Sequence, residues 1–429
     1  MARVAMLGLG FSLAPQPSLA QLAIQPLQDS VVLPDYDRGR NVGVAETPQP
    51  DYDPLGISAG DFRVFPSLTA TTQVNSNVFF NDFDKHADIA ELIQPSVFAT
   101  SDWSNALVQV YATDQIRRDA RYAVLDRNTW ATYVSGRLDM TDALTVTTLV
   151  QAGRFTENPY ASVVDGVFAV LSQYDQVTAS VKGAWTGGHL RVTAQYEHAV
   201  QAYAPLRAAA AGTIDQAYRD NRNDRELVQA EYALSPGLAV YSQVSLDAVK
   251  YRYTGAMGLS DRNSTGAAVV GGVSLDWSGV ARGALGIGYS RRDYTSGAFP
   301  DPGGLSVQAR IEVFPSAMTT VTGSAYRLLR DANSGASVAY YDSHVECDVD
   351  HALRRNVIVS ARLYYGNQAF VEDPRRRTFY QASLVGKVKF DRRFNADINL
   401  GYGKSTTNGS LAGAPFGQFV GSVALQVGI

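Results

Sequence analysis

Apolar residues alternate with polar or small ones, without interruption, over the last eleven residues of the chain. One parity holds Phe419, Gly421, Val423, Leu425, Val427 and Ile429, and the other holds Val420, Ser422, Ala424, Gln426 and Gly428. Because side chains of a β-strand point alternately to opposite faces, this pattern predicts a strand with one apolar face. A terminal strand of this kind suits a closed barrel, in which the last strand pairs with the first.

The same alternation returns along most of the chain after residue 61. Segments that place apolar residues on one parity and Thr, Ser, Gln, Asn or charged residues on the other begin near Phe62, Leu144, Leu190, Val228, Val240, Tyr380 and Phe394. Each segment is typical of a strand with one apolar and one wet face. The sequence therefore predicts an all-β chain.

The predicted connections alternate in length. Short polar turns are expected at 101–105, 141–142, 186–188, 235–237, 278–279, 315–317, 353–355 and 391–393. Longer loops are expected at 76–87, 118–127, 157–172, 203–221, 254–262, 295–304, 331–339, 370–376 and 407–416. Short turns at one end and longer loops at the other are typical of transmembrane antiparallel up-and-down β-barrels. Eight turns and nine loops connect 18 strands, with 16 as the alternative.

A secreted soluble β protein, such as a propeller or a solenoid, is the main competing interpretation. Propeller blades repeat a sequence motif every 40 to 50 residues or so, and the chain shows no such repeat. The second parity also mixes Thr, Ser, Gln, Gly and charges of both signs, as the interior of a membrane barrel does. These observations favour the barrel.

Composition agrees with a strand-rich membrane protein. Only 18% of the 429 residues are charged, and Tyr and Phe far outnumber Met. After the N-terminus no apolar stretch reaches the roughly 18 residues of a spanning helix. The net charge of −4 gives no indication of nucleic-acid binding.

The N-terminus predicts export from the cytoplasm. A short apolar run follows Arg3 and ends before Pro15, and Ser18-Leu19-Ala20 resembles a cleavage site, so residues 1–20 are expected to be a signal peptide. Residues 21–60 are rich in Pro and Asp without periodicity and predict a periplasmic N-terminal extension. Residues 61–429 then form the outer-membrane β-barrel. A short buried helix is the alternative for the apolar run.

The stretch from Asp51 to Leu68 carries a family resemblance. Its residues Asp53, Pro54, Leu55, Gly56, Gly60, Phe62, Pro66 and Ser67, followed by NSNVFF at 75–80, resemble the opening of a family of β-barrel porins of Gram-negative outer membranes. Members often occur in exopolysaccharide synthesis and export loci. The resemblance implies a barrel connected with polysaccharide secretion. The chain departs from many barrel proteins in ending with Ile429 rather than Phe.

A barrel of this size is too wide for side chains alone to fill, so an aqueous or plugged lumen is expected. The candidate lumen-lining residues are Asp342, His344, Glu346, Asp348, Asp350, Arg310, Arg362, Lys387 and Lys389. The first five lie at a spacing of two on one predicted strand face. They are interpreted either as a solvated wall paired with arginines of adjacent strands, Arg362 being nearest, or as a ladder that contacts cations or sugars.

Enzymatic chemistry finds little support in the sequence. Asp342, Ser343 and His344 are adjacent, yet on a strand Ser343 would face away from the other two. HExxH, Gly-x-Ser-x-Gly and phosphate-loop motifs are missing, and the single cysteine, Cys347, gives no metal spacing. We expect no enzyme, no catalytic residues, no metal and no cofactor.

The functional hypothesis is therefore an outer-membrane conduit or accessory pore in exopolysaccharide secretion. A general or sugar-selective diffusion porin for small solutes is the alternative, and a structural or adhesive barrel with a plugged lumen is the third possibility. Expected partners are outer-membrane lipids, lipopolysaccharide, polysaccharide and periplasmic export proteins, with no nucleic acid. Gram-negative outer membrane is the expected location.

Overall fold

A computed structural model describes residues 33–101, 103–160, 170–208, 212–253, 260–332, 337–371, 374–408 and 415–429. The predicted signal peptide, residues 1–20, and the first part of the predicted extension, residues 21–32, lie outside the described residues.

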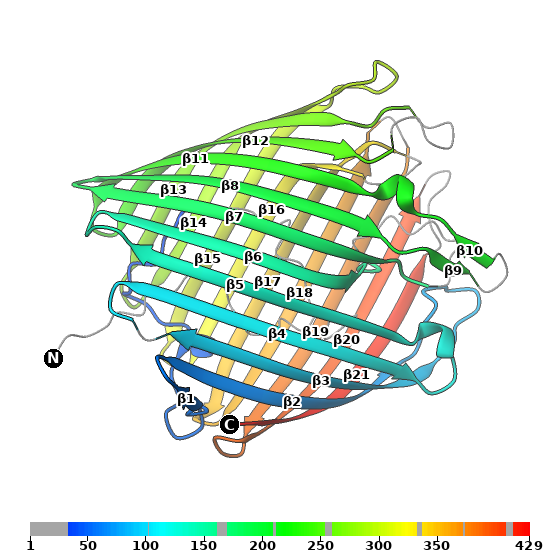
Figure 1. Ribbon diagram of the computed structural model, residues 1–429, viewed down its shortest axis with the longest axis horizontal. Coiled ribbons are helices and arrows are strands. Elements are labelled where there is room, and N and C mark those ends of the chain that lie inside the picture. Colours follow the sequence, from blue (N-terminus) through cyan, green and yellow to red (C-terminus); the bar gives the residue numbers. More distant parts are fainter. Residues whose placement is uncertain are drawn as a thin grey trace.

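The described residues form a closed barrel of 18 long strands, as the sequence predicts (Figure 1). Its strands are β2 (Phe62–Asn75), β3 (Asp88–Ser101), β4 (Ala106–Asp119), β5 (Arg127–Asp139), β6 (Leu144–Thr156), β7 (Gln173–Gly187), β8 (Leu190–Tyr203), β11 (Asn221–Ser235), β12 (Leu238–Tyr251), β13 (Ser264–Trp277), β14 (Ala281–Tyr294), β15 (Gly303–Ser316), β16 (Thr319–Asp331), β17 (Ala339–Arg354), β18 (Val357–Phe370), β19 (Arg376–Lys389), β20 (Phe394–Asn408) and β21 (Phe416–Gly428).

Shorter elements lie outside this set. The three-residue strand β1 (Ile57–Ala59) pairs with the start of β2, and β9 (Leu206–Ala208) pairs with β10 (Gly212–Ile214) within the connection from β8 to β11. Three single-turn 3-10 helices are also present among the described residues, η1 (Val44–Glu46), η2 (Ala123–Leu125) and η3 (Ala217–Arg219).

Every barrel strand pairs antiparallel with the strands before and after it, and β2 pairs with β21 to close the sheet. The closing register includes Leu68 opposite Val427 and Val74 opposite Gly421. Closure gives both terminal strands a hydrogen-bonded neighbour, which a hydrocarbon environment demands because it offers no water to unpaired backbone groups. The alternating strand predicted at the end of the chain is therefore the strand that closes the barrel.

Short turns gather at one end of the barrel and long loops at the other (Figure 1). Only residues 188–189 join β7 to β8, and Gly188 takes a positive φ of 57° there, a conformation that costs glycine little. Residues 76–87 and 157–172, in contrast, join strands at the opposite end. All eight predicted turns and all nine predicted loops fall between the strands expected. We call the two ends the turn end and the loop end.

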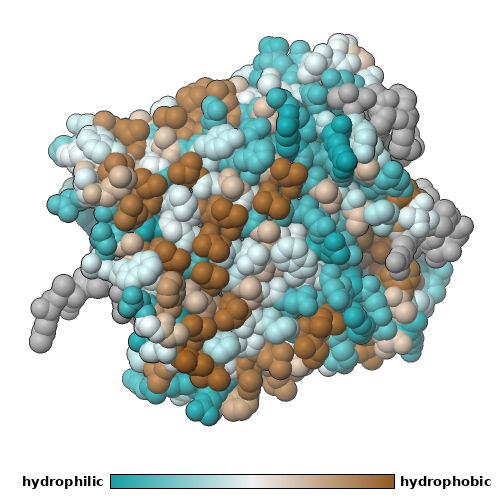
Figure 2. Space-filling model, in the orientation of Figure 1, coloured by the Kyte–Doolittle hydropathy of each residue, from teal (hydrophilic) through white to brown (hydrophobic). Residues whose placement is uncertain are grey.

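Apolar side chains face outward and polar side chains face inward. On the outer face Leu425 is 60% exposed and Ile398 50%, whereas the inward Asp276 and Gln418 are at most 1% exposed. Figure 2 shows apolar side chains gathered over the middle of the outer surface and hydrophilic ones toward the loop end. This inside-out distribution fits a barrel that meets lipid on its outer wall. Among the described residues, no helix is long and apolar enough to cross a membrane.

Adjacent residues on β19 provide a test of this facing. Leu384 lies on the outer face, 48% exposed, and Ser383 on the inner face. Leu384→Arg should lower the free energy of unfolding in lipid by roughly 2 to 4 kcal/mol, because it places a charge in hydrocarbon, while Ser383→Arg should cost far less. Reversible denaturant unfolding in phospholipid vesicles measures both, and equal losses would show that the facing is wrong.

Candidate functional site in the barrel lumen

The predicted row of titratable residues lies along the inner face of β17. Asp342 and His344 are nearest the loop end and Asp350 is nearest the turn end, because β17 begins at Ala339 after a long loop. Asp342 and His344 are each 8% exposed, while Val345 and Cys347 between the row members are exposed on the outer face. Five side chains at a spacing of two thus share one wall of the lumen.

Arginines on the neighbouring strands neutralise most of this row. Nε of Arg362, on β18, lies 2.9 Å from Glu346 Oε1 and 2.5 Å from Asp348 Oδ1. Nε of Arg330, on β16, lies 2.9 Å from Asp342 Oδ2. The Ser360 hydroxyl donates a hydrogen bond of 2.5 Å to Asp350. The wall is therefore a network of paired charges rather than a ring of free carboxylates, and Arg362 is the partner that the sequence predicts.

His344 has an aromatic environment. Its Nδ1 lies 3.1 Å from the Tyr364 hydroxyl, and its ring packs between Tyr326 of β16 and Tyr364 of β18. Ser343 faces outward and accepts a hydrogen bond from Arg327. Asp342, Ser343 and His344 thus form no nucleophile and base contact. Among the described residues, no group of three or more His, Cys, Asp or Glu side chains is arranged to hold a metal ion.

Arg310 and Lys389, two of the other predicted lumen residues, bond to carboxylates outside this row. Arg310, on β15, donates to Glu312 at 3.0 Å. Lys387 and Lys389 lie toward the turn-end half of β19, where Lys387 is opposite Asp397 in register and Lys389 bonds to Asp53 at 2.7 Å. Arg310 is still in line with Glu346, since Ser324 of β16 lies opposite both in register, whereas the two lysines lie apart from the row.

The N-terminal segment lies inside the barrel. Residues 33–56, which we call the N-terminal belt, follow the inner wall at the turn-end half. Asp35 pairs with Arg191 of β8 at 2.8 Å, Arg38 pairs with Glu231 of β11 at 3.2 Å, and the Asn41 side chain donates to Asp276 of β13 at 2.6 Å. Further along, the Val44 N–H donates to Thr320 of β16.

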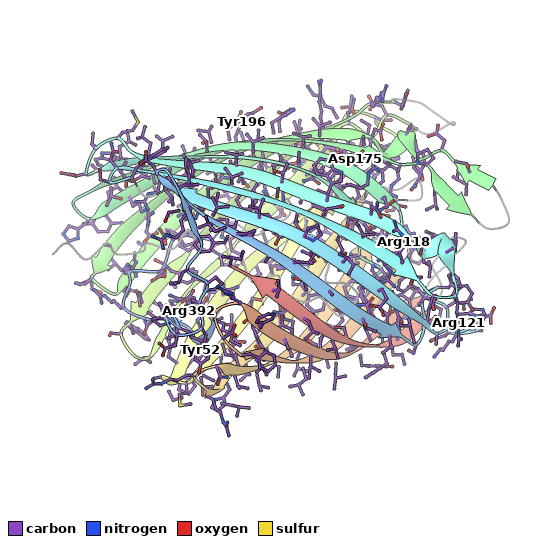
Figure 3. The ribbon with its side chains drawn as sticks, turned by 60° about the horizontal axis from the view of Figure 1, so that its bottom comes forward. Tyr52, Arg118, Arg121, Asp175, Tyr196 and Arg392 are labelled. Carbon is purple, nitrogen blue, oxygen red and sulfur yellow. The ribbon has the colours of Figure 1, made fainter. Side chains whose placement is uncertain are left out.

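The belt leaves the interior near the turn between β19 and β20. Arg392 in that turn donates two hydrogen bonds to the carbonyl oxygen of Pro50. Tyr52 and Arg392 lie close together at this end of the barrel in Figure 3. The chain then forms β1 against β2 and enters the barrel wall. The belt therefore follows the inner wall past half the strands before the first membrane-spanning strand begins.

Arg282 of β14 holds the belt most firmly. Its guanidinium donates to Glu312 at 2.7 Å, to Asp37 at 2.8 Å and to Glu46 at 2.7 Å, and also to the carbonyl oxygen of Asn41. The side chain is 3% exposed. A buried guanidinium is stable only when carboxylates and carbonyls satisfy its charge and its five N–H groups. Two of the carboxylates belong to the belt, so the belt completes the barrel wall.

Apolar packing supports the same docking. Leu33 and Tyr36 pack against a buried cluster of Tyr241, Val270 and Ala284 on the inner wall. The Tyr36 hydroxyl donates to Glu312 at 3.3 Å. Burial, reinforced by the Glu312 carboxylate, raises the pKa of Tyr36 well above its ordinary value, so the phenol stays protonated and keeps donating at any physiological pH.

A second segment enters the lumen from the loop end. Arg377 of β19 donates to the carbonyl oxygen of Pro159 at 2.7 Å, and Gln418 of β21 donates to the Tyr160 hydroxyl at 2.6 Å. Four strands separate β6, which precedes this segment, from β21 around the barrel. Residues 157–160, which we call the inward loop, therefore reach across the interior. A Cβ on Gly403 would lie 2.0 Å from the Tyr160 hydroxyl, so glycine makes room for the ring.

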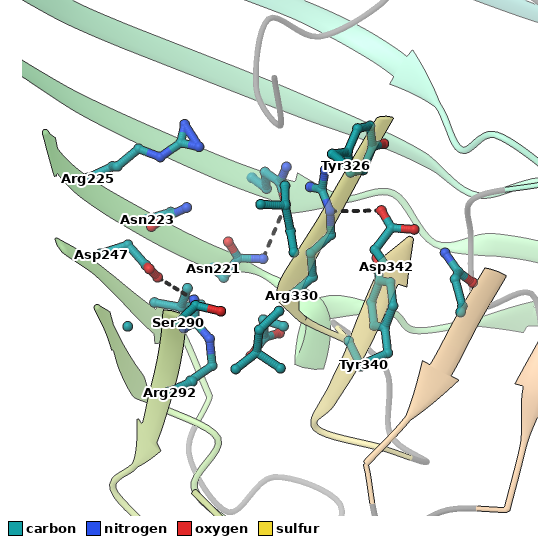
Figure 4. Close-up of a pocket in the computed structure, with 18 of the residues that line it drawn as sticks. Asn221, Asn223, Arg225, Asp247, Ser290, Arg292, Tyr326, Arg330, Tyr340 and Asp342 are labelled. Atoms are coloured by element: carbon teal, nitrogen blue, oxygen red, sulfur yellow. Dashed lines mark hydrogen bonds and ion pairs between the residues drawn. The ribbon is translucent and has the colours of Figure 1, made fainter. Parts of the chain in front are cut away.

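These two segments leave a polar cavity of about 580 Å³ in the loop-end half of the lumen. Figure 4 shows Asn221, Asn223, Arg225, Asp247 and Ser290 on one side and Tyr326, Arg330, Tyr340 and Asp342 on the other. We call this space the loop-end cavity. The sequence pattern places its residues on inward parities but does not reveal the belt or the inward loop. Neither segment shows a periodic pattern of apolar and polar residues, and the partners of both lie hundreds of residues away in the sequence.

Comparison with known proteins identifies the family. The family described as "Putative beta-barrel porin 2" matches residues 49–427. The chain belongs to this family. The family predicted from the stretch at 51–68 is therefore confirmed, and the molecule is a porin-like outer-membrane β-barrel. No curated protein sequence matches the chain.

Comparison with solved structures gives matches of low sequence identity. A BenF-like porin from Pseudomonas fluorescens Pf-5 is 11% identical, covers 86% of this chain and 99% of its own, and gives a TM-score of 0.48. The outer membrane protein opdK from Pseudomonas aeruginosa is 9% identical, with 85% and 99% covered and a TM-score of 0.46. The siderophore receptor PirA from Acinetobacter baumannii is 9% identical, with 85% and 80% covered and a TM-score of 0.42.

Removal of the Arg282 charge should release the belt of this porin-family barrel. Arg282→Gln leaves Glu312 buried without its guanidinium partner and removes the anchor for Asp37 and Glu46, a loss of roughly 3 kcal/mol or more. Trypsin cleavage after Arg38 and Arg40 should accelerate on the order of a hundredfold, because cleavage follows the population of the undocked segment.

Arg291→Gln is the matched control on the same strand. Arg291 faces outward and bonds to Asp293, and both side chains are more than half exposed, so cleavage of the belt should not change. If Arg282→Gln and Arg291→Gln are cleaved equally slowly while the barrel stays folded, Arg282 does not hold the belt.

Proposed function

We propose that this barrel acts as a conduit or accessory pore in exopolysaccharide secretion across the outer membrane of a Gram-negative bacterium. In this proposal residues 1–20 are removed on export and residues 61–429 span the membrane. Lipids and lipopolysaccharide surround the barrel, and periplasmic export proteins deliver the polymer to the turn end. The observation that carries the proposal is the loop-end cavity, a polar space lined by tyrosines, amides and paired charges.

The chemistry of that lining suits a hydroxylated chain. Hydroxyl groups both donate and accept hydrogen bonds. They therefore match the arginines of the lumen wall, which donate, its carboxylates, which accept, and its Asn and Ser side chains, which do both. Paired charges produce little net electric field. A polymer in the lumen would therefore make many weak contacts rather than bind tightly at one site. Passage requires contacts of that kind, strong enough for entry and weak enough for exit.

A diffusion porin for small solutes is the second candidate. The belt at the turn end and the inward loop at the loop end both occupy part of the lumen, and a narrowed lumen favours small permeants over a polymer. The two candidates differ in what is lost when the gene is removed.

Deletion of the gene tests the two candidates against each other. A conduit predicts that surface and extracellular polymer fall or disappear in the deletion strain, while uptake of small sugars is unchanged because other porins remain. Wild-type polymer together with slower entry of a small solute would reject the conduit and support the diffusion porin. Complementation by the wild-type gene must restore the lost trait in either case.

Neutralising the β17 carboxylates should change ion selectivity in a defined direction. In the quadruple variant Asp342→Asn, Glu346→Gln, Asp348→Asn, Asp350→Asn, Arg330 and Arg362 lose their counter-charges, so the lumen becomes more positive. The reversal potential of single channels under a KCl gradient should move toward anion selectivity.

The control for this prediction is Asp293→Asn, which removes a carboxylate from the outer face near the loop end. Its reversal potential should match that of the wild type. Heat-modifiable migration in gels checks that the quadruple variant still forms a barrel. An unchanged reversal potential in a folded quadruple variant would show that permeating ions do not meet this wall.

A further inference from the structure

The loop-end cavity has the size of a small-molecule site. Its volume of about 580 Å³ lies within the range of roughly 300 to 1,000 Å³ found for ligand pockets. Its walls come from the loop-end halves of β11, β12 and β14 on one side and of β16, β17 and β18 on the other. Strands therefore position most of the side chains discussed below, and η3 positions Arg219.

The arginines that line the cavity already have carboxylate partners. Arg292 bonds to Asp247 at 2.5 Å, Arg330 lies 2.9 Å from Asp342, and Arg219 pairs with Glu157. Arg225 lies 3.7 Å from Glu197. An anionic ligand needs a cation whose charge is available, and it would be repelled by the carboxylates of these pairs. The charge pattern therefore disfavours anions and presents alternating donors and acceptors to neutral hydroxyl groups.

The backbone is shaped around one of these pairs. Gly266 of β13 lies between Asp247 and Arg292 in the sheet. A Cβ at this position would lie 2.2 Å from Asp247 Oδ1 and 3.0 Å from a guanidinium nitrogen of Arg292. The absence of a side chain at Gly266 thus allows the ion pair to form across the strand.

Several polar atoms of the cavity wall lack partners. Within the described part of the chain, Asn223 Oδ1, Ser290 Oγ and Arg292 Nε are buried and make no hydrogen bond. A buried polar atom without a partner costs about 1 to 3 kcal/mol. All three residues line the same cavity, and together they offer two acceptors and a donor. Because these atoms are shielded from solvent, their side chains must turn toward the cavity before ligand hydroxyls can satisfy them.

The opposite wall is aromatic. Tyr326, Tyr340 and Tyr364 line it from three consecutive strands, and the Tyr364 ring is held between His344 and Phe379, with ring centroids 5.0 Å and 6.3 Å away. Tyrosine offers an apolar ring face together with a polar hydroxyl. A pyranose ring has the matching character, with C–H groups on its faces and hydroxyls at its edge.

We propose that the loop-end cavity is a binding subsite for a neutral saccharide, and that it favours uncharged sugar residues over uronic acids. The proposal rests on the proposed function, because it names the class of polymer that the conduit carries. The tyrosine side chains of one wall contact the C–H groups on the faces of the sugar ring. Asn223, Ser290 and Arg292 on the other wall bond to the hydroxyls.

Titration calorimetry on the purified full chain in detergent tests the subsite with maltohexaose, cellohexaose and hexagalacturonate as probes. At least one neutral hexamer should bind saturably, and hexagalacturonate should bind at least about tenfold more weakly. Tyr364→Ala should lower the affinity for the neutral hexamer by about threefold to tenfold. Asn223→Ala is a smaller change that leaves the aromatic wall intact, and it should lower this affinity by a similar factor.

Tyr365→Ala is the matched control, because Tyr365 is the neighbour of Tyr364 on the outer face, 43% exposed. It should bind like the wild type. The proposal is overturned if hexagalacturonate binds as tightly as the neutral hexamers, if no neutral hexamer binds, or if Tyr364→Ala and Asn223→Ala in folded protein bind like the wild type.

The outcome can be separated from that of the conduit itself. Polymer lost in the deletion strain without saccharide binding by the purified protein would refute the subsite and leave the conduit standing. Saccharide binding combined with normal polymer secretion would refute the conduit and leave a sugar-binding porin.

Discussion

The pairing of β2 with β21 is the interaction on which the rest of the structure depends. In hydrocarbon an unpaired N–H or carbonyl group costs several kcal/mol, so a sheet with two free edges could not remain in the membrane. Once the sheet is closed, its two faces have opposite environments. Lipid selects Leu, Val, Ile and Tyr for the outer parity, and the enclosed lumen collects the polar side chains.

A polar interior requires that buried charges be paired with opposite charges or hydrogen-bond partners. Charges such as Arg282, Glu312 and Asp276 are nearly excluded from solvent, and an isolated charge would be costly there. The barrel wall does not provide enough partners on its own. The N-terminal belt supplies Asp37, Asn41 and Glu46 to the wall around Arg282. The belt thereby stabilises the turn-end half of the lumen and narrows it, and the remaining polar space is the loop-end cavity.

The local alternation of apolar and polar residues predicts the barrel strands, but it does not predict which segments occupy the lumen. Strand number, turns and facing follow from alternation within about 14 residues, as at Tyr380 to Leu384, because the period of a strand is a local property. The pairing of Arg362 with Asp348 was also predictable, since β17 and β18 form a hairpin whose register brings the two residues opposite each other. In contrast, Asp37 meets Arg282 and Tyr160 meets Gln418 across more than 200 residues of sequence. Segments without a period give no sign of which wall they will contact.

In the proposed function the lumen is the path of a saccharide polymer, and a photo-cross-link inside living cells tests this most directly. A photoreactive phenylalanine analogue placed at Tyr326, which lines the loop-end cavity, should give a protein band shifted by covalent polymer when secreting cells are illuminated. The same analogue at Tyr365 on the outer face should give none. Surface polymer at normal levels with no adduct at Tyr326, or equal adducts at both positions, would contradict the account.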